Sequence, residues 1–172
     1  AETERKANDE EVELTSTGKN TTNVMFGTML QLQHVKSGHY VTVLETAAPF
    51  DRECRAVVLS PEGNSAAIFK FMPKYKSQSE GSVIYYSNSV VIESAKQRGM
   101  MLHCSEAVYS VLNDPKDPTL PKHLQAGKTH EANLSSQSGV FKVEKFARYG
   151  PEQSGCLKSH SAPFRLFHSQ SG

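Results

Sequence analysis

The chain has 172 residues, of which 37% are apolar and 22% charged, and its formal net charge is +1. This length suits one domain with a hydrophobic core. The near-neutral charge argues against a nucleic-acid binder, which would carry a strong basic excess. No stretch approaches the ~20 consecutive apolar residues of a membrane-spanning helix, so we expect no direct membrane contact in this segment.

Three widely spaced cysteines bear on the cellular compartment. Cys54, Cys104 and Cys156 are odd in number and form no CxxC pair. This arrangement indicates neither a disulfide framework nor a zinc ribbon, and it favours a reducing, cytosolic environment.

The hydrophobic pattern changes near residue 23. Residues 1–22 are acidic and rich in Thr and Asn, which predicts a solvated lead-in with a short helical arm. The following sequence has a period of two, with turn residues between short apolar runs and no long helical pattern, so we predict an all-β fold. The predicted strands are 28–35, 40–43, 56–59, 67–71, 82–86, 90–92, 100–103, 140–143 and 164–167.

One interval lacks this alternation. Residues 113–139 contain Pro115, Pro118 and Pro121, several lysines and a Ser-rich end. We expect a long loop there, inserted between two strands and without a buried core.

A repeated unit gives the most specific indication of the fold. LQLQHVKSG (30–38) and FRLFHSQSG (164–172) match without a gap, and VVIESAKQRG (90–99) is a third copy with one extra residue. One strand–turn–strand unit cannot bury its apolar face alone. Three such units that close a small barrel together predict a β-trefoil.

Neither a metal site nor a nucleophilic dyad is predicted. A zinc site needs three or four converging ligands, whereas the only close histidine pair, His34 and His39, spans a turn. His103 and Cys104 are adjacent on a predicted strand, so their side chains point to opposite faces. We therefore expect no catalytic, cofactor-binding or metal-binding residues in this chain.

The strongest candidate for a contact surface is the segment 73–81. It is polar, ends in glycine, and carries one tyrosine between two lysines. Tyrosine offers a large contact area at a low cost in conformational entropy. An ordinary turn between two strands remains an equal alternative, and no Gly-rich cradle accompanies the lysines as a phosphate site would need. The candidate residues are Pro73, Lys74, Tyr75, Lys76, Ser79 and Gly81.

The ordered series of motifs resembles the inositol 1,4,5-trisphosphate and ryanodine receptor family of intracellular calcium-release channels. VMFGTMLQLQHVKSGHYVTVL (24–44) is similar to a trefoil repeat of the inositol trisphosphate receptors. KSQSEG (76–81) is close to the ryanodine receptor version, and SNSVVIES (87–94) continues the match. RLFH (165–168) matches the opening strand of the family's second trefoil. Features of both branches occur, so the resemblance does not choose between them.

The resemblance implies an incomplete β-trefoil of the MIR type. Residues 1–22 would be the arm, and 23–158 would be the last two repeats of a first trefoil, with 113–139 as the inserted loop. Residues 159–172 would begin a second trefoil, so the chain would be a fragment. Residues 159–163, Ser-His-Ser-Ala-Pro, stand where the family has a glycine pair.

The same resemblance implies a non-catalytic regulatory module of a homotetrameric, ligand-gated calcium channel. The module would lie on the cytoplasmic face of the endoplasmic reticulum membrane and contact neighbouring domains and subunits. Inositol trisphosphate would be bound only by regions beyond residue 172. Residues 73–81 correspond to the family's inter-subunit loop, which affects gating.

Two other trefoil functions remain open. A MIR-type trefoil of a protein O-mannosyltransferase or a luminal chaperone would recognise glycans or peptide. A free-standing sugar-binding trefoil would carry exposed aromatic residues in each repeat, and only Tyr40, Tyr85 and Tyr86 suggest this. The ordered match over 59–81 and the RLFH strand favour the receptor interpretation.

Overall fold

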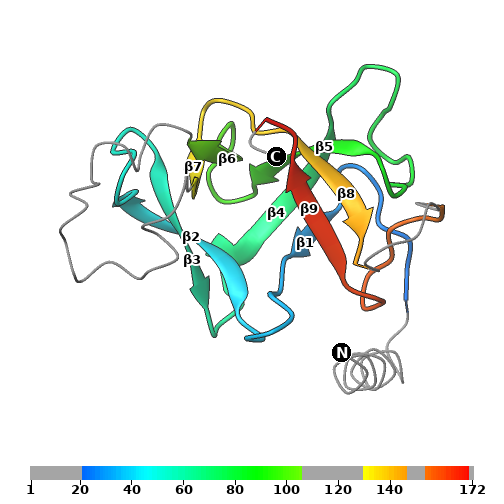
Figure 1. Ribbon diagram of the computed structural model, residues 1–172, viewed down its shortest axis with the longest axis horizontal. Helices are drawn as coiled ribbons and strands as arrows, with labels where there is room; N and C mark the ends of the chain where they lie inside the picture. The colour runs from blue at the N-terminus through cyan, green and yellow to red at the C-terminus, as the bar shows by residue number, and fades with distance from the viewer. Residues whose placement is uncertain (1–20, 106–129, 147–153, 171–172) are drawn as a thin grey trace.

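The computed structural model describes residues 21–105, 130–146 and 154–170 (Figure 1). Within these ranges the chain forms nine β-strands and one short 3-10 helix, η1 (Ser65–Ala67), which is capped by the Asn64 side chain. The predicted all-β fold is confirmed. The strands are β1 (Met29–Gln31), β2 (Tyr40–Ala47), β3 (Arg55–Ser60), β4 (Ile68–Pro73), β5 (Ser89–Ser94), β6 (Met101–Ser105), β7 (Glu131–Ser135), β8 (Phe141–Lys145) and β9 (Phe164–His168).

Alternation of buried and half-exposed side chains explains why these segments are strands. In β5, Val90 and Ile92 are fully buried, while Val91 between them is half-exposed. Phe69 and Phe71 of β4 face the same core. Period-two burial of β-branched and aromatic residues suits a pleated sheet with one face inward.

The strands form two similar units of four, followed by β9. A run of antiparallel pairs joins β1, β4, β5, β8 and β9 in that order. The hairpins β2–β3 and β6–β7 project from this run and pair through β3 and β7. In Figure 1 the β2–β3 hairpin lies at one side of the molecule and β5, β8 and β9 lie at the other.

A ring of three backbone hydrogen bonds relates the two units and β9 by an approximate three-fold axis. The N–H of Val24 donates to the carbonyl of Leu157 at 2.8 Å, and the N–H of Leu157 donates to Ile84 at 2.8 Å. The N–H of Ile84 closes the ring on the carbonyl of Val24 at 2.9 Å. Each ring residue is buried and shortly precedes β1, β5 or β9, so the repeated sequence units occupy equivalent places.

Two predicted strands differ in extent from the structure. The expected strand 28–35 is shorter, since only Met29–Gln31 pair continuously. The expected strand 82–86 makes two isolated bridges, Met25 with Val83 and Tyr85 with Cys156. The ring of backbone hydrogen bonds explains the second difference. The segment around Ile84 bonds to the segments around Val24 and Leu157, one on each side, and makes only one bridge with each of them.

The prediction that residues 113–139 hold no buried core is wrong for their last part. Glu131–Ser135 form β7, which pairs with β6 along its length and with β3 through Leu134 and Asn133. Leu134 is fully buried. The strand was missed because its other buried residues, Asn133 and Ser135, are polar, so the segment lacks the apolar alternation that predicts strands.

Several boundary predictions lie partly or wholly outside the described residues. The helical arm falls within residues 1–20, and residues 113–129 of the predicted loop also lie outside them. The division at residue 159 stays a prediction, although β9 pairs with β8 in the same sheet. Among the described residues there is no helix of the length and hydropathy needed to span a bilayer.

Candidate interaction surface

The candidate loop, residues 73–81, leaves β4 and returns to the ring, and its backbone is held at both ends. The N–H of Lys74 donates to the carbonyl of Ser89 at 3.4 Å, and the N–H of Gly81 donates to the carbonyl of Phe26 at 2.8 Å. Gly81 has φ +86, a left-handed conformation that favours glycine. The loop is thus anchored on the core side of the barrel.

Contacts inside the loop shape it into consecutive turns. The N–H and Oγ of Ser82 both donate to the carbonyl of Ser79, at 3.2 and 2.6 Å. Lys70 of β4 pairs with Glu80 at 2.9 Å, which ties the loop to the adjacent strand. Gln78 turns inward, and its buried Oε1 has no hydrogen-bond partner among the described residues. The sequence carried no signal for this inward glutamine.

The tip of the loop presents an aromatic side chain to solvent. Tyr75 is 59% exposed, and Lys74 and Lys76 on either side are also exposed. The carbonyl of Tyr75 accepts the N–H of Gln78 at 3.1 Å, so the tip is itself a closed turn. The structure therefore gathers the predicted residues along one protruding loop, with Pro73 and Gly81 at its anchored ends and the tyrosine at its tip.

A second polar cluster, which the sequence did not predict, lies between the β2–β3 connection and the β6–β7 hairpin. Ser105 Oγ donates to Asp51 Oδ2 at 2.6 Å, and Asn133 Nδ2 donates to Ser105 Oγ at 2.8 Å. The Glu131 carboxylate accepts the N–H groups of Phe50 at 3.1 Å and Asp51 at 3.0 Å. These contacts join segments far apart in sequence, so no local pattern could have indicated them.

The electrostatics of this cluster favour a structural role. The hydrogen bond from Ser105 holds the pKa of the Asp51 carboxyl below its ordinary value, despite partial desolvation. Burial raises the pKa of the nearby Cys54 thiol, which disfavours the reactive thiolate. Because its donors and acceptors satisfy one another, the cluster works as a clamp between two hairpins.

The histidines and Cys104 do not assemble into a reactive site. His103 Nδ1 lies 3.3 Å from Asn133 Oδ1, whereas Cys104 packs against the core, and burial raises the pKa of its thiol. His34 is exposed and bonds Ser37 at 2.9 Å, while His168 is buried with its ring 5.2 Å from Phe141. Within the described ranges, no three His, Cys, Asp or Glu residues are placed to hold a metal ion.

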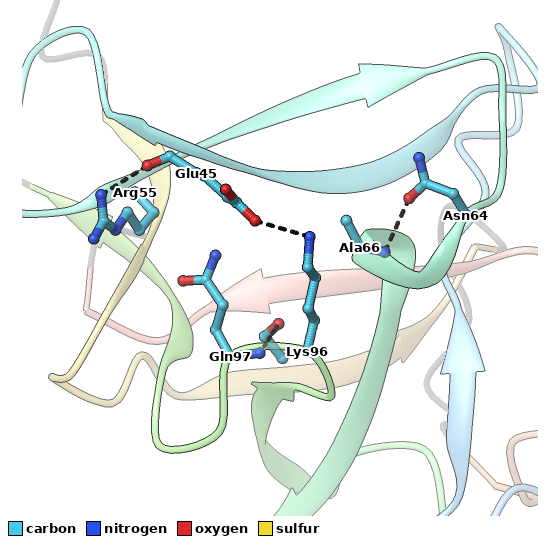
Figure 2. Close-up of polar contacts among 7 residues, drawn as sticks. Glu45, Arg55, Asn64, Ala66, Lys96 and Gln97 are labelled. Carbon is cyan, nitrogen blue, oxygen red and sulfur yellow. Dashed lines mark hydrogen bonds and ion pairs between the residues drawn. The ribbon is translucent and has the colours of Figure 1, made fainter.

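Figure 2 shows a further set of polar contacts, between the β2–β3 hairpin and the turn at 95–99. Lys96 Nζ donates to the Glu45 carboxylate at 3.0 Å, and Arg55 Nη1 donates to the Glu45 carbonyl at 2.7 Å. The Lys96 hydrogen bond lowers the pKa of the Glu45 carboxyl. Exposed ion pairs of this kind contribute little to stability, and these contacts place the turn against the β2–β3 hairpin.

Sequence comparison associates the chain with one receptor family. The family profile described as "Inositol 1,4,5-trisphosphate/ryanodine receptor" matches residues 1–125. The chain is also 29% identical over 178 residues to the inositol 1,4,5-trisphosphate receptor itr-1 of Caenorhabditis elegans. That alignment covers 98% of this chain and 6% of the worm protein, so the chain spans a small part of this relative's length.

Two solved structures are similar in fold. The SDF2-like protein from Arabidopsis thaliana has a TM-score of 0.65 at 13% identity, covering 87% of this chain and 75% of that chain. The protein O-mannosyltransferase Pmt1-Pmt2 complex of S. cerevisiae has a TM-score of 0.62 at 17% identity, covering 94% of this chain and 22% of that chain. At these identities the likeness shows the fold alone, and it confirms the predicted β-trefoil architecture.

Proposed function

Because this chain belongs to the inositol 1,4,5-trisphosphate/ryanodine receptor family, we propose that it is a non-catalytic regulatory module of a calcium-release channel. The observation that carries the proposal is Tyr75, which is 59% exposed at the tip of a loop anchored at both ends. Such a loop can pass a change in one domain to a neighbouring domain or subunit.

The physical basis of the proposal is that the barrel holds the ends of the loop in place while Tyr75 is free to contact a partner. The hydrogen bonds of Lys74 and Gly81 fix the ends of the loop against the barrel, so displacement of the barrel displaces Tyr75. An anchored tyrosine supplies apolar area and a hydroxyl, which suits the buried centre of a protein interface. Lys74 and Lys76 add positive charge at the rim, which complements an acidic partner surface. Coupling then depends on how the contact free energy differs between two channel states.

The cellular setting we propose follows from the family. The partners are neighbouring domains and subunits of a homotetramer, and inositol trisphosphate is bound by regions beyond residue 172. The module lies at the cytoplasmic face of the endoplasmic reticulum membrane. Cys54, Cys104 and Cys156 are free thiols in the structure, which is compatible with a reducing compartment.

A glycan- or peptide-recognition trefoil is the less favoured alternative. It has support from the fold of the SDF2-like and O-mannosyltransferase structures, at 13% and 17% identity. The sequence match over 98% of the chain is to a receptor instead.

The test is Tyr75→Ala in the full-length receptor. We expect reduced calcium release at saturating ligand with ligand binding nearly unchanged, because the loop transmits the signal without holding the ligand. Truncating an aromatic anchor at an interface costs ~2 kcal/mol or more when the residue is central, and much less at a rim.

Tyr85→Ala is the matched control, since Tyr85 is 54% exposed but lies outside the loop. It should release calcium as the wild type does. Normal release by Tyr75→Ala would show that the loop is an ordinary turn. An equal loss of ligand binding and release would also refute the assignment, because the loop would then act on the ligand site and not on coupling alone.

A further inference from the structure

The tip of the candidate loop carries an exposed serine next to two basic side chains. Ser77 has Lys74 three positions before it and Lys76 directly before it, and all three are exposed. Among the serines and threonines of the described residues, only Ser77 has two lysines within the three preceding positions. Three other lysines form ion pairs with glutamates, whereas Lys74 and Lys76 form none with a described carboxylate. Two uncompensated positive charges therefore precede an accessible hydroxyl.

The backbone around Ser77 can be extended at a low cost in free energy. The N–H of Gln78 donates to the carbonyl of Tyr75 at 3.1 Å, and within the described residues 75–77 make no other backbone hydrogen bond. A protein kinase binds its substrate as an extended segment, so this tip must open before the hydroxyl can react. Loss of one exposed hydrogen bond lies at the low end of the free energies of local unfolding. The bond of Gly81 to the barrel lies outside the stretch that opens.

The neighbouring serine in the loop is less suited to the same reaction. Ser79 is also exposed, but only Lys76 lies within the three positions before it. Its carbonyl accepts both the N–H and the Oγ of Ser82, at 3.2 and 2.6 Å. Glu80, the next residue, is tied to β4 by its ion pair. This part of the loop cannot extend without losing these contacts, so the structure favours Ser77 as the acceptor.

We propose that Ser77 is a phosphorylation site for a serine kinase that selects basic residues before its target, and that the phosphate weakens the contact made by this loop. The second half of this statement rests on the proposed function of the loop. In the reaction, Ser77 Oγ attacks the γ-phosphorus of ATP, the bond from that phosphorus to the ADP oxygen breaks, and the hydroxyl proton passes to a base of the kinase. Kinases select substrates by charge pattern, and acidic groups of such a kinase would pair with the two lysines.

The phosphate changes the charge of the loop tip. Lys74 and Lys76 together contribute a charge of +2, and a phosphoserine adds about −1.5 to −2 at pH 7. The tip then has almost no net charge and loses its attraction to an acidic partner surface, although the apolar area of Tyr75 is unchanged. The hydroxyl is accessible while the loop is free, so phosphorylation holds the loop in its free state.

The site is tested on the 172-residue chain with ATP and the catalytic domain of protein kinase C, which selects basic substrates, and mass spectrometry locates the phosphate. We expect phosphate on Ser77, at the same rate in the control variant Ser79→Ala. The double variant Lys74→Gln/Lys76→Gln should lower kcat/KM for Ser77 by ~10-fold or more, because it removes charge-assisted contacts to the kinase. No phosphate on Ser77, or an equal rate for the double variant, would overturn the site.

The regulation is tested with Ser77→Asp in the full-length receptor. We expect less calcium release at saturating ligand with ligand binding unchanged, whereas Ser77→Ala should release at least as much as the wild type. Aspartate supplies one negative charge only, so its loss of release should be smaller than that of Tyr75→Ala. Normal release by Ser77→Asp beside reduced release by Tyr75→Ala would overturn the regulation and keep the proposed function. Normal release by both variants would overturn the proposed function and the regulation together, while the kinase assay alone decides the site.

Discussion

At the scale of single residues, Asn133 has the clearest structural role. It is fully buried, its amide donates to Ser105 and Glu131, and its carbonyl lies against His103. Asn133→Ala should therefore lower the free energy of unfolding by ~1–3 kcal/mol, because it leaves buried partners without a hydrogen bond. Urea denaturation checks the value, with exposed Ser136→Ala as the control. Equal stability of the two variants would mean that water replaces the amide.

Asp51 predicts how stability depends on pH. Its carboxyl pKa is lowered in the folded state, chiefly by the hydrogen bond from Ser105. A carboxyl group whose pKa is lower in the folded state stabilises the protein at any pH above its pKa in the unfolded state. This stabilisation is lost as the pH falls through the pKa of the folded state. The excess stability of the wild type over Asp51→Asn should be largest above about pH 5 and shrink below the ordinary Asp pKa of about 4. Denaturation from pH 3 to 7 measures it, and a constant difference would contradict the assignment.

At the scale of elements, β7 (Glu131–Ser135) occupies the last part of the predicted 113–139 loop, so replacements that keep or remove it can be compared. Replacing residues 113–129 by a short Gly-Ser linker should cost little, since loop length changes closure entropy by only ~0.6 kcal/mol per doubling. Replacing 113–139 also removes fully buried Leu134 and the pairing of β7 with β3 and β6. Loss of one such leucine alone costs ~2–5 kcal/mol, so this variant should be much less stable or unfolded.

Thermal and urea unfolding of the two linker variants give the comparison. Equal stability of both would show that the β6–β7 hairpin contributes little to the fold. Strong destabilisation by the shorter replacement would instead indicate that residues 113–129 carry structure of their own.

At the scale of the whole molecule, the protection of backbone amides from hydrogen exchange should depend on where each strand lies in the barrel. β4, β5 and β8 have neighbours on both sides, whereas β1 and β9 end the five-strand run. Amides in the central strands should exchange only by global unfolding, and those of β9 by local opening that is ~10-fold or more faster. Hydrogen exchange resolved by residue tests this order. Uniform protection across all five strands would mean that β9 already has a second neighbour in solution.

The sequence by itself determined the all-β class, the repeated units and the place of the candidate loop. Alternation within a strand is a local property, because successive side chains point to opposite faces. Buried residues such as Val90 and Ile92 can therefore be predicted from a few neighbouring residues. The repeat positions follow from the same local pattern, and the ring of Val24, Ile84 and Leu157 places them equivalently.

Only the tertiary structure decided which distant groups meet. β7 carries buried Asn133 and Ser135, two polar residue types that are common in loops. The Asn133 amide donates to Glu131 of the same strand and to Ser105 of β6, which is distant in sequence, and only the tertiary structure brings Ser105 to it. The candidate loop likewise depends on the distant carbonyl of Phe26, which accepts the N–H of Gly81. Such partners are set by chain closure over long separations, and polar residues reach core positions only where those partners offset their desolvation.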